Sequence, residues 1–338
     1  MRNNKNEIKP NVITHEQQTS MWVRTLSAVI AIAIVLPTIF LGGWFYFALS
    51  FALIGLSSWE LVHCAKKKYN PLLYILTFLL IAVLTYTPFM RNIFTEYHGD
   101  WNLYSNFDSL YISVFVVVIG VILTFSLVLI DKNFEVRDAA YIVSFGLVIG
   151  LGIQSLLFIR YYPLNEFYGA GNAVQDSTFN YFESTALFFF VVVGSLLCDT
   201  GAYFTGVLFG RNKINERISP KKTWEGFVGG AILSFVFTQA FAFIMAANGH
   251  PIISSLDLNH WYFIVILGIV IAFVSQLGDF IFSSVKRYYG VKDFGFIMPG
   301  HGGILDRIDS VIFAVISSSA LIILFNFAIK GDWSKIFL

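Results

Sequence analysis

Nine apolar runs divide the chain, and each approaches the roughly 20 residues that an α-helix needs to cross a hydrocarbon core of about 30 Å. The runs cover residues 24–41, 43–61, 71–89, 109–130, 138–159, 184–208, 223–247, 261–284 and 308–329. Inside a bilayer every backbone N–H and C=O must bond within the protein, which only helices and closed barrels achieve. Runs of this length predict an all-α, polytopic transmembrane protein with about nine spans.

The composition excludes most other classes of protein. Apolar residues make up 57% of the chain and charged residues 13%, whereas soluble domains average about 45–50% and about 25%. A disordered chain, a coiled coil and a soluble enzyme all fit these values poorly. The net charge of +1 gives no basic field that would recruit nucleic acid. Two cysteines outside any C-x-x-C pair indicate neither a disulfide framework nor a zinc site.

Basic residues are distributed unevenly between the two sets of connecting segments. If the N-terminus is cytoplasmic, the outward-facing segments contain only four of the 22 Lys and Arg residues, namely Arg91, Arg160, Lys330 and Lys335. Membrane proteins concentrate Lys and Arg in their cytoplasmic loops. We therefore expect a cytoplasmic N-terminus, an outer C-terminus and a first apolar run that acts as an uncleaved anchor.

Polar residues near membrane depth are concentrated in the second half of the chain, mainly between positions 195 and 310. We predict a polar cytoplasmic tail over residues 1–23, N-terminal transmembrane spans over 24–180 and a catalytic transmembrane region over 181–338. An ionisable side chain inside a bilayer is expensive and is a functional candidate by default. Four aspartates within or beside apolar runs meet this criterion: Asp199, Asp279, Asp306 and Asp309.

The spacing of the last two aspartates indicates a cation site. Asp306 and Asp309 fall on one helical face, about 5–6 Å apart at Cβ, where two carboxylates repel unless a cation or proton lies between them. Magnesium suits such a site because it takes one or two carboxylates together with phosphate oxygens and water. Asp306 has an equally good structural interpretation, in which it caps the last helix and pairs with Arg307 or Lys286.

An inner loop before the seventh run is rich in basic and small residues. Ser219 followed by Pro220 has the form of an N-cap and a first helical position. Lys221 and Lys222 would then lie in the first helical turn, beside free backbone N–H groups that bind phosphate. Glu225 follows, and the glycines after it would allow close helix packing. The alternative is a basic patch attracted to anionic lipid, worth about 1 kcal/mol per charge.

A third polar cluster, residues 283–309, leads into the last run. Its aspartates could hold a metal, and its basic side chains could hold phosphates: Lys286, Arg287, Lys292 and Arg307. The glycine turn around His301 would let backbone N–H groups approach an anion. This set of groups is typical of phosphoryl or nucleotidyl transfer. His301 could act as a base or as a donor to phosphate, and the donor role is favoured.

These residues resemble the signature of the phosphatidate cytidylyltransferases, also called CDP-diacylglycerol synthases. The resemblance rests on Ser283-x-Val285-Lys286-Arg287, Lys292-Asp293-x-Gly295 and Pro299-x-His301-Gly302-Gly303-x-x-Asp306-Arg307-x-Asp309. Upstream, Asp199-x-x-Ala202-Tyr203, Ser219-Pro220-Lys221-Lys222-Thr223-x-Glu225-Gly226 and Gln276-x-Gly278-Asp279 are similar to the C-terminal half of that family. Met298 replaces the Leu, Ile or Phe that is usual there, and it is a similar apolar filler.

The resemblance implies a nucleotidyltransferase of phospholipid biosynthesis that converts CTP and phosphatidic acid into CDP-diacylglycerol and pyrophosphate. It implies Mg²⁺, in some members also K⁺, a homodimer in a bacterial cell membrane, and a site open to the cytoplasm. The family's metal ligands correspond to Asp279, Asp306 and Asp309. Catalytic roles are expected for Asp279, Lys286, Arg287, His301, Asp306, Arg307 and Asp309. Substrate-binding roles are expected for Asp199, Tyr203, Ser219, Lys221, Lys222, Glu225 and Lys292.

Two other functions stay open at this point. The first is CTP-dependent transfer to a different lipid phosphate or lipid alcohol, such as a polyprenol or an ether lipid, because the headgroup chemistry would be similar. The second is cation transport, which would explain intramembrane Asp199 and Asp279 but not the basic cluster between positions 286 and 307.

Overall fold

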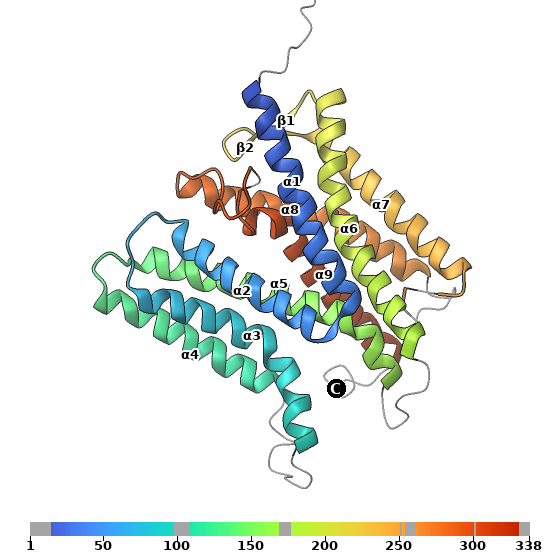
Figure 1. Cartoon of the computed structure of the whole chain (residues 1–338), viewed down its shortest axis with the longest axis horizontal. Helices are drawn as coiled ribbons and strands as arrows, with labels where there is room; N and C mark the ends of the chain where they lie inside the picture. Colours follow the sequence, from blue (N-terminus) through green and yellow to red (C-terminus); the bar gives the residue numbers. More distant parts are fainter. Residues whose placement is uncertain are drawn as a thin grey trace, which may run out of the picture.

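The computed structural model describes residues 15–97, 109–168, 177–250, 252–253, 261–300 and 302–330. Within these ranges the chain forms nine α-helices and a two-stranded antiparallel sheet (Figure 1). The helices are α1 (His15–Leu41), α2 (Gly43–His63), α3 (Pro71–Tyr97), α4 (Ser109–Ile130), α5 (Val136–Tyr168), α6 (Ser177–Phe209), α7 (Trp224–Ala247), α8 (Trp261–Tyr288) and α9 (Leu305–Lys330). The strands β1 (Lys213–Asn215) and β2 (Ser219–Thr223) form a hairpin between α6 and α7.

The predicted helical membrane class is confirmed. Each predicted run coincides with one helix, and most helices extend beyond their run. Among the described residues, seven helices contain an apolar stretch long enough to cross a membrane, whereas those of α3 and α4 are shorter, Pro71–Thr87 and Val114–Ile130. The number of spans therefore stays a prediction. α1 begins at His15, inside the segment 1–23 predicted as a polar tail.

The helices pack as two groups that α5 joins (Figure 1). One group contains α2 to α5 and the other α6 to α9, and α5 contacts both α6 and α9. Each group has its own cluster of buried apolar side chains, and residues of α8 and α9 contribute to both clusters. The C-terminal end of α8 and the start of α9 therefore lie where the two groups meet. α1 crosses the front of the view in Figure 1, and most of its side chains between Trp22 and Leu41 are exposed.

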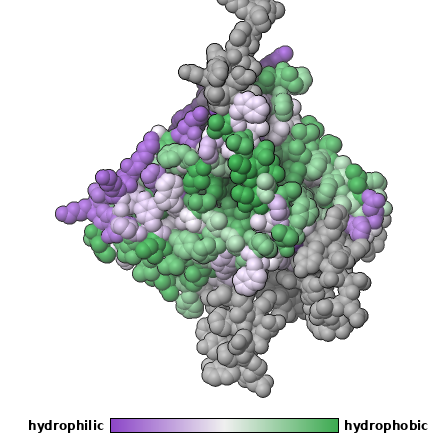
Figure 2. All heavy atoms as spheres, viewed as in Figure 1, coloured by the Kyte–Doolittle hydropathy of each residue, from purple (hydrophilic) through white to green (hydrophobic). Residues whose placement is uncertain are grey.

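Many polar side chains lie at the left edge of the view in Figure 2. Figure 2 shows apolar residues across the middle of this face and hydrophilic residues at its left edge, where the α2–α3 and α4–α5 turns lie. Lys67 joins these turns, because its ammonium donates to Asp138 Oδ2 at 2.7 Å and lies 3.6 Å from Glu135 Oε1. The hydrogen bond to Asp138 raises the pKa of Lys67.

Close packing of α6 against α7 depends on small residues. A Cβ on Gly230 would collide with the carbonyl oxygen of Cys198 and would lie 2.8 Å from the Cβ of Ala202. Lipid tails are as apolar as the side chains of a helix, so burying apolar surface does little to drive helices together in a membrane. Helix association depends instead on close packing, which small residues allow. The predicted role of the glycines after Glu225 in close packing is confirmed at Gly230.

Replacing Gly230 with Val should therefore strain the contact between α6 and α7, because overpacking a dense interior costs about 1–3 kcal/mol or more. We expect a lower midpoint of thermal unfolding for detergent-solubilised Gly230→Val than for the wild type. Ala240→Val enlarges an exposed position on the same helix and should leave the midpoint unchanged. Equal midpoints for Gly230→Val and the wild type would contradict this packing.

Candidate active site

The segment between α6 and α7 forms a hairpin rather than the start of a helix. β2 pairs with β1, and α7 begins only at Trp224. Its N-cap is Thr223, whose backbone is extended and whose Oγ1 accepts a hydrogen bond from the N–H of Gly226 at 3.1 Å. The prediction that Ser219 caps this helix is wrong. A Ser-Pro pair also suits an edge strand, where Pro is tolerated, and pairing with β1 decides the conformation.

Lys221 and Lys222 are consecutive residues of β2, so their side chains lie on opposite faces of the strand. Lys221 is exposed. Lys222 turns toward α8, where its ammonium pairs with Asp279 Oδ2 at 2.5 Å and lies 4.0 Å from the centre of the Phe280 ring. Asp279 Oδ1 accepts a hydrogen bond from the hydroxyl of Ser283 at 3.2 Å. The hairpin therefore brings a cation to the aspartate of α8.

A second ion pair lies between the end of α8 and the start of α9. Lys286 Nζ donates to Asp306 Oδ1 at 2.8 Å and lies 3.8 Å from Asp309 Oδ2. The exposed fractions of these side chains are 9% for the lysine, 3% for Asp306 and 10% for Asp309. The sequence predicts a cation or a proton between the two aspartates, and the structure places the Lys286 ammonium beside both.

Both carboxylate oxygens of Asp306 are engaged. Oδ2 accepts hydrogen bonds from the N–H of Phe294 at 2.8 Å and of Gly303 at 3.0 Å, and Oδ1 accepts from Lys286. Asp306 therefore fixes the loop between α8 and α9 at the first turn of α9. The predicted pairing of this residue with Lys286 is confirmed, whereas the N–H groups at the start of α9 donate to another residue, described below.

The predicted metal ligands Asp279, Asp306 and Asp309 do not form one three-carboxylate site. Nowhere in the described part of the chain are three His, Cys, Asp or Glu side chains arranged to hold a metal ion. Asp306 turns toward the loop, whereas the backbone of Asp309 packs against Gly278, the residue before Asp279. Asp199 of α6 accepts a hydrogen bond from the hydroxyl of Ser310 at 2.7 Å. We call these three residues of neighbouring helices, Asp199, Asp279 and Asp309, the aspartate cluster; their backbones and hydrogen-bond partners are in contact, but they do not form a preformed three-carboxylate metal site.

The local sequence around Asp279 explains its position. A Cβ on Gly278 would lie 2.7 Å from the carbonyl oxygen of Asp309, so glycine allows α8 and α9 to cross closely there. Gln276 Nε2 donates to the carbonyl of Phe227 at 2.9 Å and to the sulfur of Cys198 at 3.2 Å. The Gln-x-Gly-Asp segment thus holds α8 against α6, α7 and α9.

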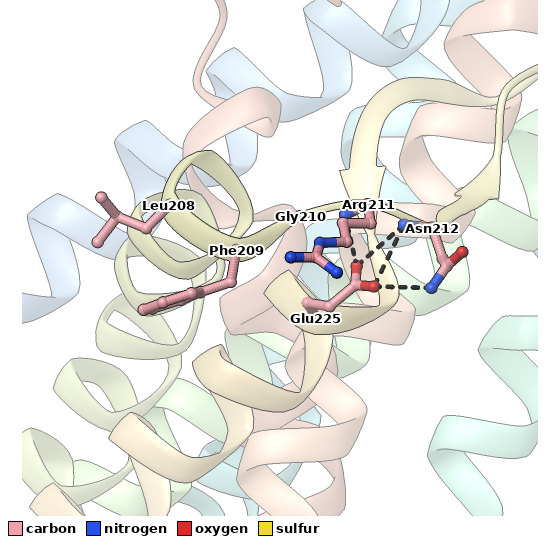
Figure 3. Close-up of a pocket in the computed structure, with 6 residues that line it drawn as sticks. All are labelled: Leu208, Phe209, Gly210, Arg211, Asn212 and Glu225. Atoms are coloured by element: carbon pink, nitrogen blue, oxygen red, sulfur yellow. Dashed lines mark hydrogen bonds between the residues drawn. The ribbon is translucent and has the colours of Figure 1, made fainter.

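Glu225 binds the turn that follows α6 (Figure 3). Its carboxylate accepts hydrogen bonds from the N–H of Arg211 at 3.1 Å and from the side-chain amide of Asn212 at 2.8 Å. These bonds tie the end of α6 to the start of α7. A shallow pocket of about 500 Å³ lies here, lined by Leu208, Phe209, Gly210, Arg211, Asn212 and Glu225. A substrate-binding role for Glu225 stays a prediction.

Arg287 joins the hairpin to the loop after α8. Its Nε donates to the carbonyl of Ile218 at 3.2 Å, and one terminal nitrogen donates to the carbonyl of Val291 at 3.1 Å. The guanidinium therefore holds these two backbone segments together.

The remaining predicted residues lie further out. Tyr203 is 68% exposed and packs edge-on against the neighbouring Phe204 ring, outside the aspartate cluster. Lys292 and Arg307 are exposed, and Arg307 lies within electrostatic range of Asp199. His301 lies outside the described residues.

Sequence reasoning missed Glu60. This side chain is fully buried in α2, and it accepts hydrogen bonds from the N–H groups of Ile304 at 2.9 Å and Leu305 at 2.8 Å. A signal was present, because Glu60 lies inside the predicted apolar run 43–61, where an ionisable residue is a functional candidate.

Comparisons with known proteins agree with the resemblance. Residues 22–325 match the cytidylyltransferase family. The phosphatidate cytidylyltransferase of Staphylococcus haemolyticus (strain JCSC1435) is 34% identical over 298 residues, covering 87% of this chain and 96% of the relative. The protein of the same name from Staphylococcus aureus (strain COL) is 32% identical over 300 residues, with the same coverage of both chains.

Replacing Lys286 with Met should destabilise the protein, because removing one partner of a buried ion pair costs about 3–5 kcal/mol. The midpoint of thermal unfolding in detergent should fall, and adding Asp306→Asn should recover part of the loss by removing one unpaired charge. Lys213→Met removes an exposed lysine from the hairpin and serves as the control. A Lys286→Met protein as stable as the wild type would contradict the described ion pairs.

Proposed function

The chain belongs to the cytidylyltransferase family, and we propose that it transfers the cytidylyl group of CTP to phosphatidic acid, giving CDP-diacylglycerol and pyrophosphate. The observation that carries this proposal is the aspartate cluster together with its two ion-paired lysines, Lys222 and Lys286. Carboxylates that hold a divalent cation, beside basic groups that hold phosphate, are what transfer from a nucleoside triphosphate requires. Membrane helices surround this cluster, which suits a lipid substrate.

The reaction needs one bond to form and one to break. A phosphate oxygen of phosphatidic acid attacks the α-phosphorus of CTP, and the bond from that phosphorus to the bridging oxygen breaks as pyrophosphate leaves. A phosphomonoester has its second pKa near about 6, so the attacking group is already anionic at about pH 7. No strong general base is needed, and we assign none to His301. Positioning and charge stabilisation supply most of the catalysis.

Magnesium is the cation that we propose for the aspartate cluster, and the donor set suits it. Mg²⁺ takes one or two carboxylates and fills its other positions with phosphate oxygens and water. Asp279 and Asp309 would hold it, with Asp306 fixing the loop beside them. Each of these two carboxylates already faces an ammonium group, so both stand where a cation is favoured. Bound Mg²⁺ would neutralise charge that develops on the phosphates. A potassium requirement stays a prediction.

The basic residues divide into two groups by their accessibility. Lys286 is buried between two carboxylates, and we propose that it fixes their positions rather than binding phosphate. Lys222 has 27% of its side chain exposed, and we propose that its ammonium would contact the triphosphate of CTP once Asp279 holds the cation. Lys221, Lys292 and Arg307 are exposed and stay candidates for phosphate contacts.

The proposed site faces the cytoplasm of a bacterial cell. In Figure 1 the hairpin lies near the top, and the α2–α3 and α4–α5 turns lie at the left. These segments contain Lys66, Lys67, Lys68, Lys132, Arg211, Lys213, Arg217, Lys221 and Lys222. Cytoplasmic loops of membrane proteins are enriched in such residues. The homodimer that the family resemblance implies stays a prediction.

The alternative lipid substrates would use the same cluster, because the phosphate chemistry is shared. Competition between phosphatidic acid and a polyprenol or ether-lipid phosphate in mixed micelles separates these substrates. Membership of an enzyme family removes the cation-transporter alternative.

Replacing Asp279 with Asn should lower cytidylyl transfer at least about 100-fold, because losing one electrostatic stabiliser of a transition state costs about 10²–10³ in rate. The measurement is pyrophosphate release by detergent-purified protein with CTP, phosphatidic acid and Mg²⁺, omitting each in turn. Glu216→Gln changes an exposed carboxylate in the hairpin and serves as the control. Turnover that is retained in folded Asp279→Asn would contradict the role of this residue.

Labelling with a membrane-impermeant maleimide tests the orientation. Glu216→Cys lies in the exposed hairpin and should react in inside-out vesicles but not in intact cells. Asn248→Cys, at the opposite end of α7, should show the reverse pattern. The native Cys64 and Cys198 are buried and should add little background. Labelling of Glu216→Cys in intact cells would contradict a cytoplasmic site.

A further inference from the structure

We infer that Glu60 is a positioning residue for the aspartates of α9, an inference that rests on the proposed function. Glu60 belongs to α2, in the helical group that carries none of the motifs described above. Its side chain is fully buried. A carboxylate in such surroundings is strongly disfavoured unless the protein supplies donors for it, so its partners are informative.

The carboxylate of Glu60 caps the start of α9. Oε1 accepts the N–H of Ile304 at 2.9 Å, and Oε2 accepts the N–H of Leu305 at 2.8 Å. The first N–H groups of a helix have no partner within the helix, and the helix dipole gives them partial positive charge. Hydrogen bonds from such groups to an ionised carboxylate are short and strong. They fix the two residues that directly precede Asp306.

The loop backbone wraps closely around this carboxylate. A Cβ on Gly295 would lie 2.6 Å from Oε1 of Glu60, and a Cβ on Gly303 would lie 2.5 Å from Oε2, so a larger residue at either position would displace the carboxylate. The N–H groups of Gly303 and of Phe294, the neighbour of Gly295, donate to Asp306 Oδ2. Glu60 and Asp306 therefore hold the same two loop segments.

Two consequences follow for the proposed site. Asp309 lies one turn beyond Asp306, so its position depends on how the first turn of α9 is held, and Glu60 holds that turn from a different helical group. Helix N-termini commonly bind phosphate, but Glu60 already accepts the N–H groups of Ile304 and Leu305. A substrate phosphate must therefore rely on the basic side chains and the cation.

The first test measures cation binding by the full chain in detergent, without CTP or lipid. Mn²⁺ serves as the probe, and electron paramagnetic resonance reports free Mn²⁺. Residues that orient metal ligands typically contribute about 10–100-fold to metal affinity, so Glu60→Gln should bind Mn²⁺ at least about tenfold more weakly. In Glu60→Gln an NH₂ group replaces one of the two carboxylate oxygens. That group would face the N–H of Ile304 or Leu305, so one of the two hydrogen bonds would be lost. Ser57→Ala changes a buried residue one turn earlier in α2 and should bind Mn²⁺ like the wild type.

The second test measures hydrogen exchange of the segment that contains Ile304 and Leu305, by mass spectrometry. Exchange should be faster in Glu60→Gln than in the wild type and unchanged in Ser57→Ala, because only the first variant loses the acceptors of these N–H groups. Turnover should fall mainly in kcat, since Glu60 touches no substrate. Glu60→Asp keeps the charge but is one methylene shorter, so it should fall between Glu60→Gln and the wild type in Mn²⁺ affinity.

Several outcomes would overturn the inference. Wild-type Mn²⁺ affinity in folded Glu60→Gln would assign this residue a purely structural role, even if the thermal midpoint falls. Unchanged exchange at Ile304 and Leu305 would contradict the described hydrogen bonds. If Glu60→Gln does not fold, Gly303→Ala displaces the same carboxylate and should show the same loss of Mn²⁺ affinity. A wild type that releases no pyrophosphate would contradict the proposed function instead, and hydrogen exchange would still test the cap.

Discussion

An unpaired charge cannot be buried among apolar helices, because moving it out of water costs several kcal/mol even after the protein relaxes. This chain meets that constraint by giving several of its buried and half-buried charges partners from other elements. The pairs and their partners are Lys222 with Asp279, Lys286 with Asp306 and Asp309, Asp199 with Ser310, and Glu60 with the start of α9. Each partner comes from another helix or loop, so satisfying the charges also decides how α2, α6, α8, α9 and the hairpin are placed.

The same pairing prepares the site for its substrates. Lys222 and Lys286 balance part of the negative charge of the aspartate cluster, which offsets the mutual repulsion of its carboxylates. Under the proposed function, Asp279 would hold the divalent cation, and the Lys222 ammonium would then face the triphosphate of CTP instead of this carboxylate. Cation and nucleotide would favour each other at such a site, because each would satisfy a charge that the other releases.

The helical architecture could be predicted closely from the sequence, because bilayer thickness fixes the length of an apolar run. The sequence also allowed the pairing of Asp306 with Lys286 to be predicted. The local conformation of the hairpin could not be predicted, since pairing with β1 overrides the signal of Ser219 and Pro220. The cap on α9 was also missed, because Glu60 and Leu305 lie far apart in the sequence and only the packing of α2 brings them together.

The central claim is that the α-phosphorus of CTP moves to the phosphate of a lipid. The most direct test gives purified protein phosphatidic acid, Mg²⁺ and CTP labelled with phosphorus-32 at either the α- or the γ-position, then separates lipid from water-soluble products. The account predicts that the α-label enters the lipid fraction and that the γ-label appears in pyrophosphate. A γ-label in the lipid, or no label in the lipid from either nucleotide with protein that is shown to be folded, would contradict it.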